Sequence, residues 1–259
     1  MPRIRIDGDT GGAPSSSAER SLRLLSLLAQ EGRALSLAEL SVRLGLPKVT
    51  THRLCAQLLE GGYLARDVDE RCFAVGPALR KLAFDTLNHG VVRGLRHEVL
   101  AALVMKVGET CNFTTLDGTQ VLYIDRVEAQ WPLRLTLDVG SHVPLHCTAS
   151  GKLFLAELPA EEREALIAQL PLTRMTRQTI TSARALKTEC AAIAAQGHSS
   201  DREEFIAGLI AVAVPVRDAS GRTRAAIALH APSARLSLAE AQRQLPALRA
   251  AAAQMATLL

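Results

Sequence analysis

Two short helices joined by a tight turn are predicted between Ser36 and Gly62, and this stretch restricts the fold more than any other. Ser36 and Glu39 have the Ser-x-x-Glu spacing of a capping box, in which each side chain bonds to the other residue's backbone at a helix start. Gly45 follows the last apolar position of the first helix and suits a sharp turn. Pro47 can open the second helix, because its fixed φ and missing N–H fit a first turn. The pattern predicts a helix-turn-helix.

The second helix of this pair has one face suited to packing and another that is free for contacts. Leu54 and Leu58 recur at the spacing of a buried helix face, whereas Lys48, Thr50 and Arg53 fall outside it. In a DNA-binding helix-turn-helix the second helix lies in the major groove, where basic and hydroxyl side chains contact phosphates and base edges. The alternative on these residues alone is an ordinary helical hairpin with solvated charges.

A short β-hairpin is predicted directly after the two helices. Residues 63–66 and 71–75 are β-like runs on either side of an acidic tip at residues 67–70, which fits the wing of a winged helix-turn-helix. The hairpin therefore favours the DNA-binding interpretation. The candidate DNA contacts are Ser36, Lys48, Val49, Thr50, Thr51, His52, Arg53, Arg66 and Arg71.

Composition limits what the rest of the chain can be. A chain of 259 residues with 48% hydrophobic residues can bury two ordinary cores. The formal charge of +4 permits a nucleic-acid partner without requiring one. Five cysteines without a CxxC pair indicate reduced thiols in a cytoplasmic protein. The sequence lacks an apolar run long enough to span a membrane, and residues 1–17 resemble a disordered arm rather than a signal peptide.

Helices flank the predicted DNA-reading unit. Residues 18–31 are expected to form a support helix with Leu22, Leu25 and Leu28 on its packed side. Residues 78–87 are expected to form a connecting helix after a Gly-Pro break.

From residue 92 onward, helices mix with strands, which indicates a second domain. Asp117-Gly118 is a strong hairpin turn signal that pairs two strands antiparallel, and a second capping box at Ser237 and Glu240 begins the final helix. The arrangement is α+β. The predicted helices are 92–107, one starting at Thr148 or Ser150 and ending at residue 157, 160–169 and 182–196, and the predicted strands are 111–116, 120–127, 133–138, 209–216 and 223–229.

Several separated stretches, in this order, resemble the IclR family of bacterial transcription regulators. They are SLRLLSLLA, LSLAELSVRLGLPKVTTHRLCAQLLEGGYL, GETCNFTTLDGTQVLYIDRVE, LHCTASGKLFLAEL and GHSSDREEFIAGLIAVAVPVRD, and the resemblance covers nearly all of Ser21 to Leu259. It implies a winged helix-turn-helix joined by a linker helix to a GAF-like domain that binds a small effector, working as a dimer or tetramer on operator DNA. The expected parts are a disordered arm (1–17), the winged domain (18–77), the linker helix (78–91) and the effector-binding and oligomerisation domain (92–259).

The chain departs from the family pattern within the second helix. Similar proteins often have serine then valine where Val49 and Thr51 stand here. A core-facing Thr51 is tolerable if its hydroxyl bonds to a backbone carbonyl, and Val49 can meet a thymine methyl group in the groove. The operator sequence is therefore not transferable from relatives.

The resemblance also implies where an effector would bind. Family pockets form between the sheet and the helices near residues 148–152, 201–204 and the last two strands. Members that bind small polar acids such as glyoxylate use a cysteine and two serines at positions that align with Ala211, Ala228 and His230. This loss of polar groups suggests a larger, more apolar effector such as an aromatic acid, with His230 or His198 meeting its carboxylate. The candidate effector contacts are Thr115, Leu145, Cys147, Thr148, Ala149, Gly151, His198, Asp201, Ala211, Ala228 and His230.

Other chemistry is weakly supported by the residue pattern. Cys147 beside His146 is a poor nucleophile–base pair, because adjacent side chains usually point apart. The scattered His and Cys lack zinc-site spacing, and Lys152 lacks the upstream glycine of a phosphate loop. We therefore expect no catalytic residue, no metal and no cofactor. The acidic turn at residues 201–204 is either a pocket rim or a solvated loop.

The sequence thus predicts a cytoplasmic, dimeric or tetrameric transcription regulator whose binding to operator DNA responds to a small effector, and the family often controls an adjacent catabolic operon. The effector would favour one arrangement of the C-terminal domains, and the linker would transmit the change to the reading heads. Two rivals stay open. One is an enzyme anchored by the N-terminal unit, and the other is a structural protein that binds DNA non-specifically.

Overall fold

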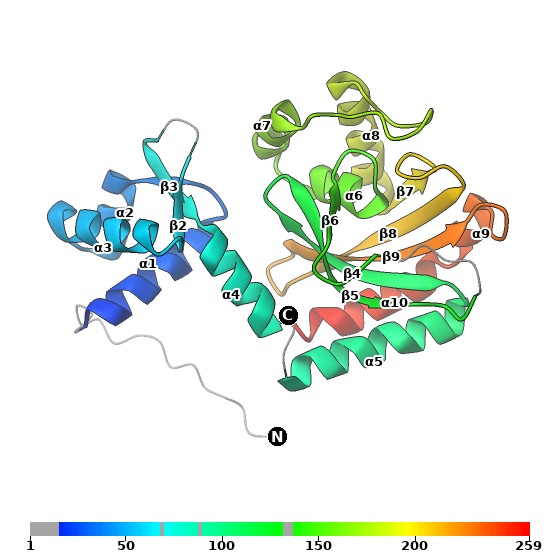
Figure 1. Cartoon of the computed structure of the whole chain (residues 1–259), viewed down its shortest axis with the longest axis horizontal. Coiled ribbons are helices and arrows are strands. Elements are labelled where there is room, and N and C mark those ends of the chain that lie inside the picture. The colour runs from blue at the N-terminus through cyan, green and yellow to red at the C-terminus, as the bar shows by residue number, and fades with distance from the viewer. Residues whose placement is uncertain (1–15, 68–69, 88–89, 132–136) are drawn as a thin grey trace. The chain divides into compact units, whose positions relative to one another are not determined.

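The computed structural model describes residues 16–67, 70–87, 90–131 and 137–259, and these fall into two compact units that divide between Thr86 and Leu87 (Figure 1). The predicted arm at residues 1–17 lies almost entirely outside the described residues. So does most of the strand predicted at residues 133–138, and the described residues 137 and 138 are not in a strand. Among the described residues, no helix combines the length and hydropathy needed to cross a membrane.

The N-terminal unit is a three-helix core closed by a small antiparallel sheet of order β1-β3-β2. Its apolar core gathers leucines from all three helices around Phe73, which is 2% exposed. The helix-turn-helix and the wing are both present, as predicted. The elements are α1 (Ser17–Glu31), β1 (Leu35–Ser36), α2 (Leu37–Leu44), α3 (Lys48–Glu60), β2 (Leu64–Arg66), β3 (Cys72–Val75) and α4 (Pro77–Leu87).

Details of this unit differ from the sequence expectations. Leu22 is 64% exposed, and Leu24 packs into the core in its place. At about 100° per residue, Leu24, Leu28 and Leu25 follow one another within about 100° of the helix surface, whereas Leu22 lies off that face. Pro47 precedes α3 as its N-cap instead of forming its first residue. Strand β1 was not predicted, because two residues show no periodicity.

The C-terminal unit is built on a six-stranded antiparallel sheet of order β6-β5-β4-β9-β8-β7. Figure 1 shows α5 and α10 on one face of this sheet and α6, α7 and α8 on the other. This confirms the predicted α+β class. The strands are β4 (Thr110–Asp117), β5 (Gln120–Val127), β6 (His142–Pro144), β7 (Ser199–Arg202), β8 (Leu209–Arg217) and β9 (Thr223–Pro232), and the helices are α5 (Gly90–Val107), α6 (Ala149–Glu157), α7 (Ala160–Gln169), α8 (Ala183–Gln196), α9 (Leu238–Arg243) and α10 (Leu245–Ala256).

Alternation along the central strands gives the two faces of the sheet different side chains. Large residues such as Val212 and Leu229 pack toward α5 and α10. Small ones, chiefly Ala211 and Ala228, face α6 and α8. Because successive strand residues point to opposite faces, the centre of the α6 face of the sheet is lined by alanines, whose small side chains pack against α6 and α8.

Several boundaries in this unit differ from the predictions. The β4–β5 loop is Gly118-Thr119, because Asp117 still pairs with Gln120. Strands β6 and β7 were missed. The second capping box is present, but Ser237 caps the short helix α9, and α10 starts afresh after Gln244 with a proline in its first turn. The domain limits at residues 77 and 91 stay predictions.

Candidate functional site

The turn between α2 and α3 is fixed by hydrogen bonds at both ends of α2. Ser36 Oγ accepts from Glu39 N at 3.3 Å, and Glu39 Oε2 accepts from Ser36 N at 2.9 Å. Donation to the Glu39 carboxylate from the Ser36 backbone N–H, and then from the Ser36 hydroxyl, lowers the pKa of Glu39 to about 2. After α2, Gly45 has a φ of 66°, and Ser41 Oγ donates to Leu46 O at 2.6 Å. The Ser36 hydroxyl is therefore engaged in the cap, which makes it a positioning group for α2.

Helix α3 presents its outward side chains much as the sequence suggests. Val49 is 83% exposed, and Lys48, His52 and Arg53 are also exposed. Thr51 is fully buried, and its hydroxyl donates to Pro47 O at 3.2 Å. Thr51 is thus not a DNA contact, since a side chain facing the core cannot reach the groove. It has the backbone partner that a buried threonine needs.

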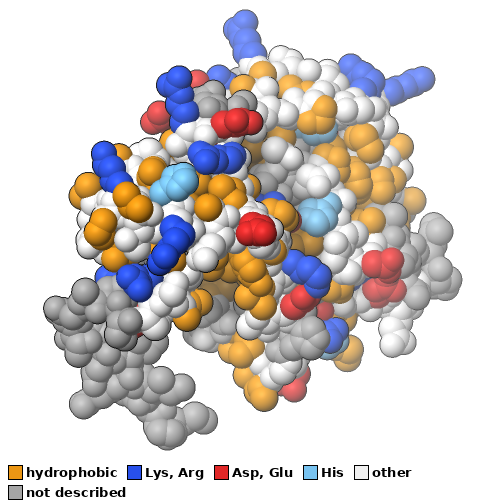
Figure 2. All heavy atoms as spheres, turned by 60° about the vertical axis from the view of Figure 1, so that its left-hand side comes forward, with side chains coloured by type: hydrophobic (Ala, Val, Ile, Leu, Met, Phe, Trp, Pro, Cys, Tyr) orange, Lys and Arg blue, Asp and Glu red, His pale blue; other side chains and the backbone are white. Residues whose placement is uncertain are grey.

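The wing carries two of the predicted DNA contacts, Arg66 and Arg71, and their side chains differ in what they bind within the wing. The Arg66 guanidinium lies 4.4 Å from the Phe73 ring centroid and donates to Glu70 O at 2.7 Å. Arg66 is therefore turned back onto the wing, where it braces the loop, although it stays exposed. Arg71 is exposed, and its backbone N donates to Asp67 Oδ1 at 3.1 Å. Figure 2 shows Lys and Arg side chains standing out from this unit, with apolar side chains between them.

The α6 face of the large sheet forms the floor of the candidate effector site. Strand register places Ala211 between Asp201 on β7 and His230 on β9. In the next row, Ala228 lies opposite Asn112 on β4. The floor is thus a strip of alanines with polar side chains along both edges.

Four buried polar atoms on this floor, or in the turn at its β7 edge, have no hydrogen-bond partner among the residues that the structure describes. They belong to a donor amide, a hydroxyl, a carboxylate and an imidazole: Asn112 Nδ2, Ser199 Oγ, Glu204 Oε2 and His230 Nε2. An unpaired buried polar group costs about 1–3 kcal/mol, so native proteins keep few of them. Their concentration around one face of the sheet is the arrangement expected of a site that a polar ligand completes.

Burial sets the charge states around the floor. It raises the pKa of Asp201 to about 7, so this carboxyl is partly protonated at neutral pH. It lowers the pKa of His230 to about 3, helped by Arg126, so the imidazole is neutral. Arg126 donates to Asn112 Oδ1 at 3.0 Å and orients that amide. One edge of the floor therefore offers hydrogen-bond donors beside a cation.

The start of α6 lies above the floor. Thr148 caps the helix, with its Oγ1 accepting from Gly151 N at 3.1 Å and donating to Pro144 O at 2.7 Å. Gly151 has no room for a side chain, because a Cβ there would lie 2.3 Å from Leu145 O. Burial, and then the negative charge of Asp201, raise the pKa of Cys147 to about 12. Its thiol is protonated and unsuited to act as a nucleophile.

Lys152, in the first turns of α6, is fully buried at the candidate site, a position that the sequence did not reveal. Its Nζ contacts Glu189 Oε1 at 3.2 Å and forms a shorter ion pair with Glu204. Arg202 in turn contacts Glu189 Oε1 at 2.9 Å. Asp201 Oδ1 accepts from Glu204 N at 2.7 Å, so these two carboxyl groups lie in the interior, whereas Glu203 is half-buried beside a surface hollow.

Two predicted effector contacts do not lie on this floor. Thr115 follows the floor-facing Thr114, so alternation turns it to the opposite side, where its hydroxyl donates to Arg224 O at 2.8 Å. His198 lies after the end of α8, and its Nδ1 is 3.3 Å from Gln196 O. The floor and its cover do bring together Leu145, Cys147, Thr148, Ala149, Gly151, Asp201, Ala211, Ala228 and His230.

Several residues of the floor were missed from the sequence. Asn112, Arg126 and Ser199 were not among the predicted contacts. Thr110, Asn112 and Thr114 alternate with apolar residues along β4, and this pattern could have signalled a polar face. Ser199 gave no such signal, because β7 is short and mostly polar.

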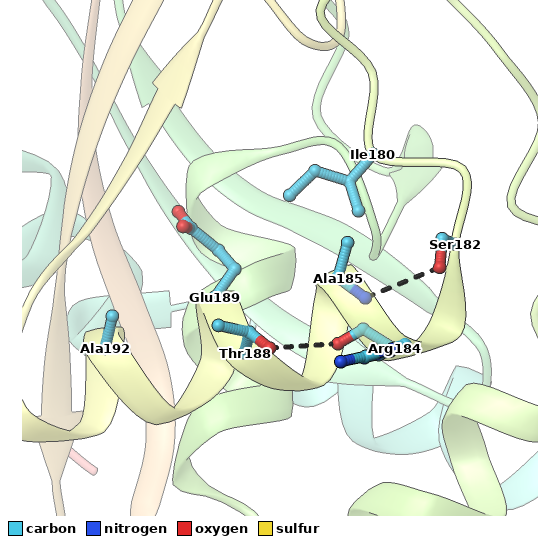
Figure 3. A pocket seen from close by; sticks show the side chains of 7 residues that line it. All are labelled: Ile180, Ser182, Arg184, Ala185, Thr188, Glu189 and Ala192. Atoms are coloured by element: carbon cyan, nitrogen blue, oxygen red, sulfur yellow. Dashed lines mark hydrogen bonds between the residues drawn. The ribbon is translucent and has the colours of Figure 1, made fainter.

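Surface hollows occur beside the candidate site. One of about 580 Å³ is lined by residues 175–178, 203 and 205–207, next to the turn that carries Glu204. Another, on α8, is shown in Figure 3. There Ser182 Oγ accepts from Ala185 N and Thr188 donates to Arg184 O, so these polar groups serve their own helix. Among the described residues, no group of three or more His, Cys, Asp or Glu could hold a metal ion.

A winged helix-turn-helix followed by an α+β domain with a polar-edged interior site defines a DNA-binding regulator of the effector-responsive class. The model of the IclR helix-turn-helix domain matches residues 17–68, and that of the bacterial transcriptional regulator IclR C-terminal domain matches residues 84–257. The chain belongs to the IclR family of transcriptional regulators, and it is a regulator rather than an enzyme.

Individual relatives match along nearly the whole chain. "Probable transcriptional regulator SauR" of Cupriavidus necator is 43% identical over 241 residues, covering 93% of this chain and 96% of SauR. A solved regulator from Rhodococcus sp. RHA1 is 29% identical with a TM-score of 0.64, covering 94% of this chain and 97% of its own. An IclR homolog from Microbacterium hydrocarbonoxydans, solved in complex with 4-hydroxybenzoate, is 25% identical with a TM-score of 0.58, covering 94% and 99%.

Proposed function

We propose that this regulator binds operator double-stranded DNA in the cytoplasm as a homodimer or homotetramer, and that a small organic acid bound between the sheet and α6 changes its affinity for that DNA. The observation that carries the effector site is the set of four unpartnered buried polar atoms at the floor. The cytoplasm is where the operator DNA of a bacterial regulator lies. A neighbouring catabolic operon is the proposed target.

The chemistry of the two edges favours an aromatic acid that carries a hydroxyl group. Asn112 Nδ2 and the neutral His230 ring, beside Arg126, suit a carboxylate. Across the alanine strip, the free oxygen of Glu204 suits a hydroxyl donor. We place a flat ring between them over Ala211 and Ala228, because neither side chain rises far from the sheet. The solved homolog that binds 4-hydroxybenzoate supports the same class.

Calorimetric titration of the full chain tests this assignment. We expect 4-hydroxybenzoate to bind more tightly than benzoate, and both to bind more tightly than glyoxylate or pyruvate. Asn112→Asp should weaken the aromatic acids at least about tenfold, because it sets a carboxylate against the ligand's. Thr115→Ala is the matched control, since Thr115 faces away from the floor. Preference for glyoxylate or pyruvate over every aromatic acid would contradict the proposal.

Proposed DNA contacts divide by what each side chain can reach. Lys48, exposed at the start of α3, is assigned to phosphate, and its change to alanine should weaken binding to all sequences and reduce the salt dependence. Thr50 and Val49 are assigned to base edges, so Thr50→Ala and Val49→Ala should relax preference at single positions. Gel shifts with DNA upstream of the protein's own gene measure both effects. Operator binding unchanged in all three variants would remove α3 from the interface.

A change in operator affinity upon effector addition, without turnover of the effector, is the outcome expected of this regulator. Binding that ignores DNA sequence and effector, and varies only with salt, would support the non-specific structural role instead. In the proposed mechanism, the effector favours one arrangement of the paired C-terminal units, and α4 transmits that arrangement to the two winged domains. The winged domains must contact DNA half-sites that lie about one helical turn, or a multiple of one turn, apart.

A further inference from the structure

Helix α5 has an apolar face on the side away from its own core. Its inner side packs Leu100, Leu103 and Val104 against the sheet and α10. On the outer side, Val91 is 79% exposed and Met105 is 86% exposed. Figure 1 shows α5 along the outside of the C-terminal unit. A soluble helix normally shows polar residues on its outer face, so this face suits a partner.

Charge on the outer face is arranged symmetrically about a small residue. Ala102 is exposed at the middle, with exposed Glu98 four residues before it and exposed Lys106 four residues after it. At 3.6 residues per turn, the two charges lie about 40° to either side of Ala102. Two copies of α5 packed antiparallel about a two-fold axis at Ala102 therefore place Glu98 of each copy against the partner's Lys106. Alanine at the axis allows the helices to approach closely.

Apolar surface continues beside this axis. A hollow of about 380 Å³ lies at the end of α5, lined by Ala101, Met105, Gly108 and residues 127–131. Leu95, 42% exposed, is seven residues before Ala102, and Gly108 is six residues after it. At about 100° per residue, Leu95 lies roughly 20° from Ala102, whereas Gly108 lies roughly 120° away on the other side. Leu95 therefore adds apolar surface next to the axis, and the hollow lies to one side of the contact.

We infer that α5 forms a two-fold contact between two copies of this chain, centred on Ala102 and closed by two Glu98–Lys106 ion pairs. The inference adds a surface to the proposed homo-oligomer and is independent of the effector. A helix of 18 residues is roughly 27 Å long, so the contact covers a few hundred Å² per copy, less than the roughly 800 Å² of a stable interface. We therefore expect association through this contact to depend on protein concentration.

Charge reversal tests the contact. Glu98→Lys and Lys106→Glu should each weaken association about tenfold or more, because both ion pairs become repulsive at once. The double variant Glu98→Lys/Lys106→Glu should restore it. Within one chain the two residues are eight positions, roughly 12 Å, apart along the helix, so such rescue requires contact between copies. Arg93→Glu, nine residues before Ala102 and on the opposite side of the helix, should leave association unchanged.

Sedimentation velocity of the full chain over a range of concentrations measures the association. Weakening by both single variants with rescue by the double variant supports the contact. Single variants that associate like wild type would overturn it while leaving the proposed homo-oligomer intact. A chain that is monomeric at every concentration, with and without DNA, would overturn both.

Discussion

Replacing Lys152 with methionine should lower the free energy of unfolding of the C-terminal unit by about 3–5 kcal/mol. Lys152 is 0% exposed, and its ammonium contacts Glu204, whose side chain is 4% exposed, and Glu189, at 19%. Methionine fills a similar volume but removes the charge. Glu189 keeps Arg202 as a partner, whereas Glu204 is left as a buried carboxylate without a cation. The expected loss is the cost of that unpaired charge.

A second substitution separates this cost from lost packing. Lys152→Met/Glu204→Gln removes both charges of the buried pair, and we expect it to recover most of the loss, because a neutral pair needs no desolvation of ions. The control is Lys187→Met, which breaks a surface pair with Glu164 at 3.4 Å in which the side chains are 43% and 62% exposed. That pair should contribute no more than about 1 kcal/mol.

Urea unfolding followed by tryptophan fluorescence is the appropriate assay. The chain has one tryptophan, Trp131, and it lies in the C-terminal unit, so its signal reports that unit. A change in midpoint at constant slope gives the stability difference directly. If Lys152→Met cost no more than Lys187→Met, the buried ion pair would not be supporting the fold, and the reasoning would fail.

Two further predictions concern single groups. The folded-state pKa of Asp201 is about 7, against an ordinary 3.8, so its contribution to stability is complete below pH 3.8 and is lost as the pH rises toward 7. Across that window, the stability of Asp201→Asn should rise relative to wild type by up to about 4 kcal/mol, measured by urea unfolding at each pH. Parallel pH profiles of the two proteins would contradict this prediction. Gly76→Ala should destabilise the N-terminal unit by about 1–3 kcal/mol, because a Cβ there would lie 2.2 Å from Gly62 O. Amide hydrogen exchange measures the effect, and Gly61→Ala is the control, because the added methyl meets only the movable Tyr63 ring; equal exchange in the two variants would refute the steric argument.

Local signals made much of the fold predictable from sequence. The capping boxes at Ser36 and Ser237 are present because cap, turn and helix lie within a few residues of one another. Strand β7 was missed, since its pairing depends on β8 and its own sequence, SSDR, has no β-strand character.

The candidate effector site was likewise only partly predictable from the sequence. Ala211, Ala228 and His230 were reached through the family resemblance, and the structure places them on one face. Their role as effector contacts stays a prediction. The burial of Lys152 was not predictable, because its partners lie 37 and 52 residues away in sequence and meet it only in the folded unit.

The junction between the wing and α4 has a mechanical consequence. Gly76 N donates to Tyr63 O at 2.8 Å, Ala78 N donates to Gly62 O at 3.0 Å, and Arg80 Nη1 donates to Val75 O at 2.8 Å. These hydrogen bonds fix the first turn of α4 to the base of the hairpin, and no flexible linker residue separates the two. A rotation of α4 would therefore rotate the winged helix-turn-helix with it. A chimaera that grafts a new reading head onto this chain should therefore join within α4, after Arg80, and not at the Gly-Pro break.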